Sequence, residues 1–341
     1  MPVKLANTQQ PVHFYPDWKA ELSQTINSTS ELLEHLNLSK EGLSDAQKAA
    51  LDFPLKVPKS FVARMNSGDP LDPLLTQVLP SRAELDTSAG YTKDPLEESH
   101  YNPVPGIVHK YRNRVLLIVS PNCAINCRYC FRRHFPYQDN QLSKQQWQKT
   151  LEYIRNKPEI NEVIYSGGDP LAANDHFLSW LTTQIEDIAH IKRLRIHSRL
   201  PTVIPSRVDN QLLTWLTATR LKTIMVLHIN HANEIDSSVS SAVKKLLGVG
   251  VQLFNQTVLL RGINDNPSAL VELSEKLFDN QIMPYYLHLL DPVEGASHFD
   301  IPYAQALDLY QRVQSELPGY LVPKLVRDKP GEKFKTIQKN K

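Results

Sequence analysis

Apolar residues after position 115 fall alternately into short β-rich runs and longer segments with helical spacing. Six runs are typical of strands: 115–120, 162–166, 194–197, 223–229, 251–260 and 283–289. From Phe177 to Ile188 apolar positions recur at helical spacing behind a cap at Asn174 or Asp175, and another helix fits 268–279. This alternation predicts an α/β fold: a partial barrel of six parallel strands, whose functional residues follow the C-terminal strand ends.

The first hundred residues differ from this pattern and predict a helical region. Capping signatures precede apolar positions at Ser28 with Glu31 and at Ser44 with Gln47. The stretch 71–105 is rich in Pro, Asp and Ser, which indicates a loop that wraps over a core. We therefore expect three parts: a helical N-terminal region with its wrapping loop over 1–100, the barrel over 101–300, and a C-terminal helix and tail over 301–341.

Charge and hydropathy exclude two classes of partner. Lys and Arg total 38 against 36 Asp and Glu, a net charge of +2, which argues against a broad nucleic-acid surface. The longest aliphatic run, 115–119, is too short to span a bilayer, and charged residues interrupt the N-terminus before any signal core. The sequence predicts a soluble cytosolic protein.

The three cysteines of the chain lie within eight residues, as Cys123, Cys127 and Cys130. An odd number in one short loop is a poor disulfide framework and favours a shared metal site in a reducing compartment. Three thiolates at C-x3-C-x2-C spacing can hold three irons of a cubane cluster and leave the fourth open. A structural zinc with His134 as fourth ligand is the main alternative, and a coincidental trio of free thiols is another.

This spacing after the first barrel strand resembles the radical S-adenosylmethionine (SAM) superfamily. The aromatic residue usual before the last cysteine is Tyr129, and Ser166-Gly-Gly-Asp-Pro170 resembles the glycine-rich SAM-binding turn. The resemblance implies that the open iron binds the amino and carboxylate groups of SAM. An electron from the reduced cluster then cleaves SAM to methionine and a 5′-deoxyadenosyl radical.

Longer runs narrow the resemblance to the lysine 2,3-aminomutase family over roughly 95–335. They are His109-Lys-Tyr-Arg-Asn-Arg114, Cys127-Arg-Tyr-Cys-Phe-Arg-Arg133, Tyr165-Ser-Gly-Gly-Asp-Pro170, His228-Ile-Asn-His-Ala-Asn-Glu234, Gln256-Thr-Val-Leu-Leu-Arg-Gly-Ile-Asn-Asp265, Tyr285-Tyr-Leu-His-Leu-Leu-Asp291 and Gly319-Tyr-Leu-Val-Pro323. The small size and the end soon after Lys335, without the zinc-binding extension of the larger catabolic enzymes, resemble the branch that makes (R)-β-lysine for modifying translation elongation factor P.

The resemblance implies an isomerase that needs pyridoxal 5′-phosphate (PLP) besides the 4Fe–4S cluster and SAM. The radical takes hydrogen from Cβ of lysine, the nitrogen moves from Cα to Cβ, and hydrogen returns to Cα. The PLP Schiff-base lysine is implied seven residues after Asp328, at Lys335, in a tail that folds over the barrel mouth. Glu332, Lys333 and Phe334 replace most of the family's glycines, so Lys333 or Lys329 could compete, and a solvated basic tail is the simplest alternative. An extended chain would put Lys333 and Lys335 on one face.

The family's substrate residues map onto a charge pattern that suits free L-lysine. Arg132 matches the carboxylate clamp, and Asp291 and Asp328 match paired acceptors of the side-chain ammonium. Two buried carboxylates repel unless a cation lies between them, which favours lysine over glutamate. The alternatives are surface charge for Arg132 and Asp328, and a loop start for Asp291.

The remaining cofactor contacts are implied by family register. Tyr111 and Arg114 lie where the family contacts PLP; Ser166, Gly167, Gly168, Asp169, His228 and Gln256 match SAM positions; and Arg199 is a candidate anion contact. Expected partners are a reductant protein and, indirectly, the ligase that attaches β-lysine to elongation factor P, and a homo-oligomer is compatible with the sequence. The alternatives are an aminomutase for another amino acid such as glutamate, and a non-catalytic iron–sulfur or zinc protein.

Overall fold

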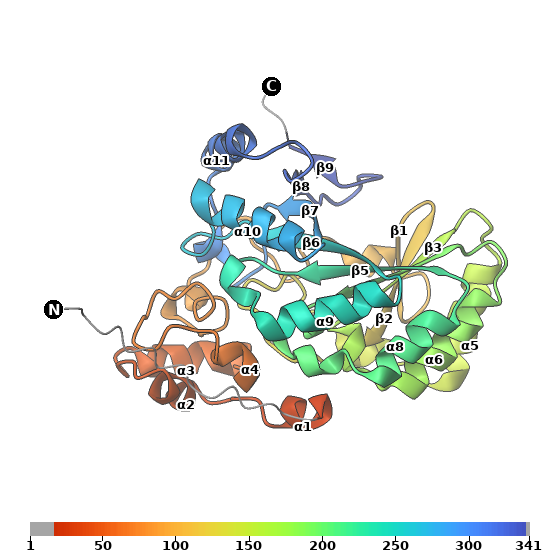
Figure 1. Cartoon of the computed structure of the whole chain (residues 1–341), viewed down its shortest axis with the longest axis horizontal. Coiled ribbons are helices and arrows are strands. Elements are labelled where there is room, and N and C mark those ends of the chain that lie inside the picture. The colour runs from red at the N-terminus through yellow and green to blue at the C-terminus, as the bar shows by residue number, and fades with distance from the viewer. Residues whose placement is uncertain (1–16, 339–341) are drawn as a thin grey trace.

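A nine-stranded sheet in sequence order forms the centre of this computed structural model, which describes residues 17–338 (Figure 1). The strands are β1 (Ile107–Tyr111), β2 (Arg114–Ser120), β3 (Glu162–Gly167), β4 (Arg193–Ser198), β5 (Lys222–His228), β6 (Gln252–Val258), β7 (Met283–His288), β8 (Lys324–Arg327) and β9 (Thr336–Ile337). Strands β2 to β8 pair in parallel, whereas β1 and β9 add antiparallel at the two ends. The sheet is therefore open, a partial barrel as predicted.

The six predicted strands, β2 to β7, are confirmed to within two residues at either end. The structure adds β8 as a seventh parallel strand, and it was missed because its apolar run, 325–326, is only two residues long. Strand β9 pairs with β8 through Val326 and Ile337, and this pairing returns the tail to the sheet.

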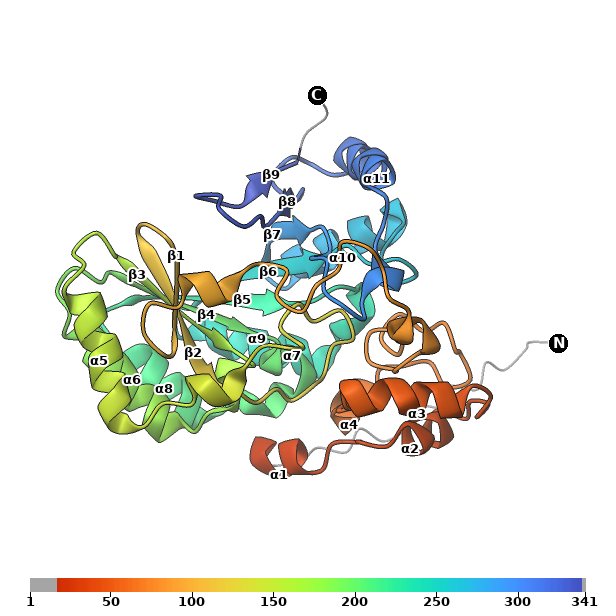
Figure 2. The same cartoon turned by 180° about the vertical axis from the view of Figure 1, so that it is seen from behind.

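Helices connect the parallel strands, and the α5, α6, α8 and α9 group lies along one side of the sheet (Figure 2). The helices after β2 are α5 (Lys144–Arg155), α6 (Asp175–Glu186), α7 (Leu200–Val203), α8 (Asn210–Ala218), α9 (Ser237–Gly248), α10 (Pro267–Asp279) and α11 (Tyr303–Glu316). Asn174 caps α6 by accepting from the Phe177 N–H over 2.8 Å, as one of the two predicted caps. The helix predicted over 268–279 is α10, one residue longer.

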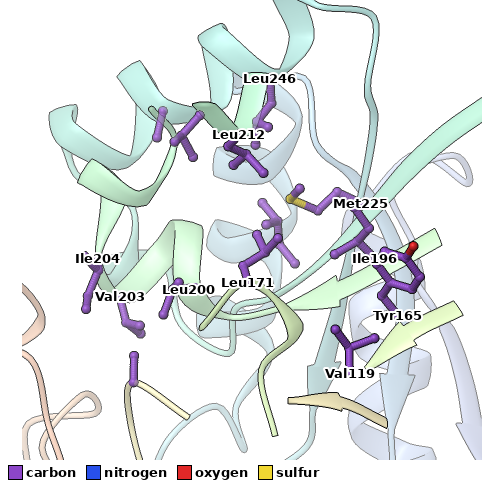
Figure 3. Close-up of a cluster of buried hydrophobic side chains, with 14 of the residues drawn as sticks. Val119, Tyr165, Leu171, Ile196, Leu200, Val203, Ile204, Leu212, Met225 and Leu246 are labelled. Atoms are coloured by element: carbon purple, nitrogen blue, oxygen red, sulfur yellow. The ribbon is translucent and has the colours of Figure 1, made fainter. Parts of the chain in front are cut away.

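The core between these helices and the strands is apolar (Figure 3). Ile196 and Met225 project from neighbouring strands toward Leu212 of α8 and Leu246 of α9, and all four side chains have no exposed surface. Each such residue stabilises the fold by about 1.5–3 kcal/mol relative to an exposed side chain. The phenol of Tyr165, buried in the same layer, shares a 3.0 Å hydrogen bond with Thr182 of α6. The helices therefore cover this side of the sheet, and the side chains on its other side point away from them.

Four short helices form an N-terminal lobe beside the sheet (Figure 1). They are α1 (Trp18–Ser23), α2 (Thr29–His35), α3 (Leu43–Asp52) and α4 (Lys59–Val62). Ser28 caps α2 as predicted, accepting from the Glu31 N–H. The predicted cap at Ser44 is wrong: α3 begins one residue before it, after Gly42, whose φ of 74° suits glycine.

The predicted wrapping loop contains only short 3-10 turns and lies against the barrel. Its turns are η1 (Arg82–Leu85) and η2 (Glu98–Tyr101); the others are η3 (Tyr137–Asn140), η4 (Pro170–Ala172), η5 (Pro205–Arg207), η6 (Ala232–Glu234) and η7 (Ser297–Phe299). The backbone of Thr92 pairs with the loop after β7 through Pro292 O, over 2.9 Å.

None of the helices between residues 17 and 338 has the length and apolar composition that crossing a membrane requires.

Candidate active site

One large cavity, of about 910 Å³, lies on the side of the sheet that faces away from the core helices. Every residue predicted for the site lines it: Tyr111, Arg114, Cys123, Cys127, Cys130, Arg132, Ser166, Gly167, Gly168, Asp169, Arg199, His228, Gln256, Asp291, Asp328 and Lys335. These residues come from β1, from all the parallel strands or the loops that follow them, and from the C-terminal tail. The structure therefore assembles one site from segments separated by more than two hundred residues.

The cysteine loop follows β2 and holds its three thiols toward the cavity. Its backbone is tied to the N-terminal region, because the Asn126 N–H donates to Lys56 O and the Arg128 N–H to Gln77 O, both over 2.9 Å. Burial raises the pKa of Cys130 to about 11 and that of Cys123 well above its usual value, and the neighbouring cysteines add to both shifts. Cationic iron would offset both effects, so the donor set fits a cluster.

The zinc alternative places its fourth ligand outside this cavity. His134 does not line it, and its Nε2 lies 3.4 Å from the carbonyl of Glu294. Between residues 17 and 338, no three His, Cys, Asp or Glu side chains are gathered closely enough to hold a single metal ion.

The glycine-rich turn after β3 packs directly on the start of the cysteine loop. The Gly168 N–H donates to Ser120 O and the Asp169 N–H to Asn122 O, both over 2.8 Å. A Cβ on Gly168 would lie 2.7 Å from Asn122 O, and one on Gly167, where φ is 118°, would lie 2.6 Å from Ser120 O. Both glycines are thus required by a close approach of two backbones, in addition to any contact with a cofactor.

Replacing Gly168 with alanine is expected to lower the free energy of unfolding by ~1–3 kcal/mol, because the added methyl group meets rigid backbone. Chemical denaturation measures the change. Gly248→Ala is the matched control: nothing lies within 4 Å of its added Cβ, so stability should be unchanged or higher by up to ~1 kcal/mol. Equal effects at the two positions would contradict the close-approach explanation.

Asp169 is buried, and its carboxylate is fully engaged by the chain. It accepts from Ser198 Oγ over 2.7 Å and from the backbone N–H groups of Leu171, Arg199 and Leu200 over 2.8–3.0 Å. The side chain therefore joins the turn after β3 to the end of β4. It shapes the cavity wall by holding backbone in place.

Arg132 is buried and already has a carboxylate partner. Its Nε and Nη2 donate to the two carboxylate oxygens of Glu98, each over 2.7 Å, and its Nη1 donates to Ser166 Oγ over 3.0 Å. Glu98, on η2 of the wrapping loop, was not predicted from the sequence. Arg128 of the cysteine loop pairs in the same way with Glu84 of η1, and Arg133 Nη2 donates to one oxygen of that carboxylate over 3.0 Å.

Two carboxylates that line the cavity, Asp328 and Asp291, are in different states. Asp328 accepts from Lys335 Nζ and Lys110 Nζ, both over 2.7 Å, and from the Tyr111 hydroxyl over 3.1 Å. Burial raises the pKa of Asp328, but Lys335 and Lys110 outweigh burial and bring that pKa below its usual value. Burial raises the pKa of Asp291 to about 7; Lys335 offsets part of the rise and Asp328 adds to it. Within the described chain, Asp291 Oδ1 has no hydrogen-bond partner.

The tail brings one lysine to the cavity. Lys335 lines it, whereas Lys333 and Lys329 are exposed and do not. The expected extended conformation is wrong: the chain bends at Lys333 and Phe334, and Phe334 is 63% exposed. Lys333 and Lys335 consequently do not share a face.

Three histidines on the strands give the cavity neutral polar atoms. His288 is buried and His197 and His228 are half-buried, and in the described residues none of their Nε2 atoms has a hydrogen-bond partner. Burial lowers the pKa of all three, that of His228 to about 3, so the rings stay neutral. His197 and His288 were not predicted. The alternation of side-chain direction along a strand could have identified His197, because Arg195, His197 and Arg199 line the cavity at every second position.

Comparisons with known proteins identify the family of the chain. The family model described as the radical SAM superfamily matches residues 117–273. L-lysine 2,3-aminomutase of Escherichia coli (strain K12) is 51% identical over 94% of both chains, and that of Haemophilus influenzae is 50% identical over 94% of this chain and 95% of its own. L-lysine 2,3-aminomutase of Clostridium subterminale is 34% identical over 94% of this chain and 77% of its own. The chain therefore belongs to the lysine 2,3-aminomutase family of radical SAM enzymes, which combine a 4Fe–4S cluster with SAM.

Proposed function

We propose that this aminomutase converts L-lysine to (R)-β-lysine with the cluster, SAM and PLP, for attachment to elongation factor P. One observation carries the proposal: the three thiols, the tail lysine, the buried arginine and the two acidic residues line a single cavity. The higher identity with the Escherichia coli relative, 51% against 34% with the clostridial one, supports the branch of the former. A reductant protein would supply the electron.

Cys123, Cys127 and Cys130 would each hold one iron and leave the fourth for SAM. When bound to the reduced cluster, SAM supplies the radical that removes hydrogen from the substrate. Ser166, Gly167, Gly168, His228 and Gln256 are the proposed SAM contacts, together with the backbone of Asp169, whose carboxylate is already engaged by the chain. Among them, His228 has the unpartnered Nε2, which suits a hydrogen bond to a ligand.

The cavity also fits PLP. Lys335 Nζ reaches it from the tail, and Arg114 lies on the wall with its guanidinium carbon 4.2 Å from the centre of the Tyr111 ring. His197 and His288 offer further unpartnered nitrogen atoms. When bound, PLP supplies a conjugated system through which an amino group can move between adjacent carbons of a radical. The protein's part is to hold the cofactor through Lys335, Tyr111 and Arg114 and to exclude water.

The charged side chains that line the cavity suit a substrate with a carboxylate and a distant ammonium. Arg132 Nη2 keeps one N–H beyond those donated to Glu98, Ser166 and Gly167, and this N–H can bind the substrate carboxylate. Asp291 and Asp328 would accept the ammonium. Lys335 now donates to Asp328 Oδ2, so engagement of Lys335 by a cofactor frees this oxygen for the substrate, while Oδ1 keeps its bonds from Lys110 and Tyr111. Asp291 and Asp328 together disfavour glutamate, whose second charge is negative.

Asp291→Asn is expected to leave iron and PLP content unchanged and to lower kcat/KM for L-lysine. The loss should correspond to ~2–5 kcal/mol of binding free energy, because a desolvated ammonium loses its charged partner. Steady-state kinetics measure the loss. Asp265→Asn, on the exposed surface, is the control and should behave as wild type. A wild-type kcat/KM for Asp291→Asn would remove this residue from the substrate site.

The size of that loss should depend on pH. Since burial raises the pKa of Asp291 to about 7, its side chain is neutral below this pH and charged above it. Only the charged form attracts the ammonium, so the wild-type to variant ratio of kcat/KM should rise between about pH 6 and pH 8. A constant ratio over this range would contradict ammonium binding by ionised Asp291.

Two alternatives have direct tests. Anaerobic assays with L-glutamate in place of L-lysine distinguish an aminomutase of different specificity, which would turn over glutamate. Anaerobic absorbance distinguishes a non-catalytic zinc protein, which would be colourless, from an enzyme with the broad visible absorption of cluster and PLP.

A further inference from the structure

Arg199 contacts one of the cysteine sulfurs. It follows β4 directly, is 5% exposed, and donates from Nη1 to Cys127 Sγ over 2.7 Å and to the Tyr129 hydroxyl over 2.6 Å. Cys123 and Cys130 have no arginine donor of this kind among the hydrogen bonds of the described chain. The contact singles out one of the three ligands proposed for the cluster.

A buried network holds the guanidinium in this place. Its Nη2 donates to Gln77 Oε1 over 2.6 Å and to Glu234 Oε2 over 3.0 Å. The Tyr129 hydroxyl also accepts from Asn230 Nδ2 over 2.6 Å. The partners of Arg199 thus come from the wrapping loop, the cysteine loop and the segment after β5, so its position is set independently of any cofactor.

We propose that Arg199 is a positioning residue that raises the reduction potential of the cluster through Cys127. Reduction adds one negative charge to the cluster. An N–H donated to a ligand sulfur and a fixed positive charge beside it both stabilise the more negative, reduced state, and burial strengthens both effects. The inference rests on the proposed ligation by Cys127. It makes Arg199 a partner of a cluster ligand, where the sequence predicted a contact to a bound anion.

Glu234 opposes this effect. Its Oε2 is the carboxylate partner of Arg199, and its Oε1 accepts from the Asn230 N–H over 2.8 Å. Glutamine at this position retains an oxygen for the Asn230 N–H and removes the negative charge. The two substitutions Arg199→Gln and Glu234→Gln should therefore shift the potential in opposite directions, a pattern that general loosening of the site does not produce.

The test is a redox titration of the reconstituted cluster with dithionite and mediators, followed by electron paramagnetic resonance. No SAM is added, so an effect through SAM binding cannot contribute. For Arg199→Gln we expect the ratio of reduced to oxidised cluster at fixed potential to fall about tenfold, a shift of about 59 mV to more negative potential. Arg199→Lys keeps the charge and should recover part of the shift. Glu234→Gln should shift the potential to more positive values.

Arg207→Gln is the matched control. Arg207 lies in the same connection between β4 and β5, is buried and pairs with Asp175, but does not line the cavity. The reduction potential of the cluster in Arg207→Gln should equal that of the wild type. A wild-type potential for Arg199→Gln, or an equal shift for Arg207→Gln, would overturn the inference.

Two further measurements distinguish the possible outcomes. If Arg199→Gln does not retain its iron, Glu234→Gln carries the test: a positive shift supports the inference, and an unchanged or negative shift overturns it. Iron content and the cluster signal of the wild type test the proposed ligation separately, because an unshifted potential in a protein with a full cluster rejects only the role of Arg199.

Discussion

Alanine in place of any one of Cys123, Cys127 or Cys130 should abolish activity and remove most of the bound iron. The chain has only these three cysteines, so no spare thiolate can replace a lost ligand. A cluster that keeps only two of its three protein ligands is expected to lose iron readily. Iron analysis and electron paramagnetic resonance of the anaerobically reconstituted variants measure the effect.

His134→Ala is the control for the cysteine variants. His134 would be the fourth ligand of a zinc site, but it does not line the cavity, so its variant should keep wild-type iron content. Near-full iron with retained SAM cleavage in any cysteine variant would refute this ligand set. Loss of metal in the His134 variant would favour the zinc site.

Lys335→Ala should lose all PLP that borohydride reduction can fix covalently to the chain, and with it the activity. Lys335 Nζ faces the cavity and lies 2.7 Å from Asp328 Oδ2, whereas Lys333, two residues earlier, is exposed. Mass spectrometry of the reduced protein locates the modified peptide. Lys333→Ala is the matched control and should retain both PLP and activity.

Either of two other outcomes would change the account. Loss of bound PLP in the Lys333 variant alone would move the anchor by two residues. Retention of PLP in both variants would mean that the tail does not hold the cofactor covalently, and the proposed mechanism would fail.

The barrel could be predicted from the sequence because short β-rich segments recur along the chain with helical segments between them. Some strands are continuous runs, as in β5, which reads Thr-Ile-Met-Val-Leu between Lys222 and His228, and others alternate, as in β4 with Leu194 and Ile196. β8 and β9 were missed because they have four and two residues and depend on pairing with distant strands. The cap at Ser44 failed because a glycine at positive φ starts α3 instead.

The position of the site could be predicted, but several of its partners could not. Motifs that follow strand ends converge in a barrel, which brought the cysteines, the glycine turn and Asp291 together. Glu98 and Lys110 pair with Arg132 and Asp328 across 34 and 218 residues of sequence, and no local pattern indicates such pairs. The bend at Phe334, which separates Lys333 from Lys335, likewise depends on the pairing of β9 with β8.

The most direct test of the account is anaerobic incubation of the reconstituted enzyme with SAM, PLP, a reductant and free L-lysine. Chiral chromatography of the products measures the reaction. The account predicts (R)-β-lysine, formed only when SAM and PLP are both present. Failure of enzyme with full cluster and PLP to form any β-lysine, or formation of β-lysine without PLP, would contradict it.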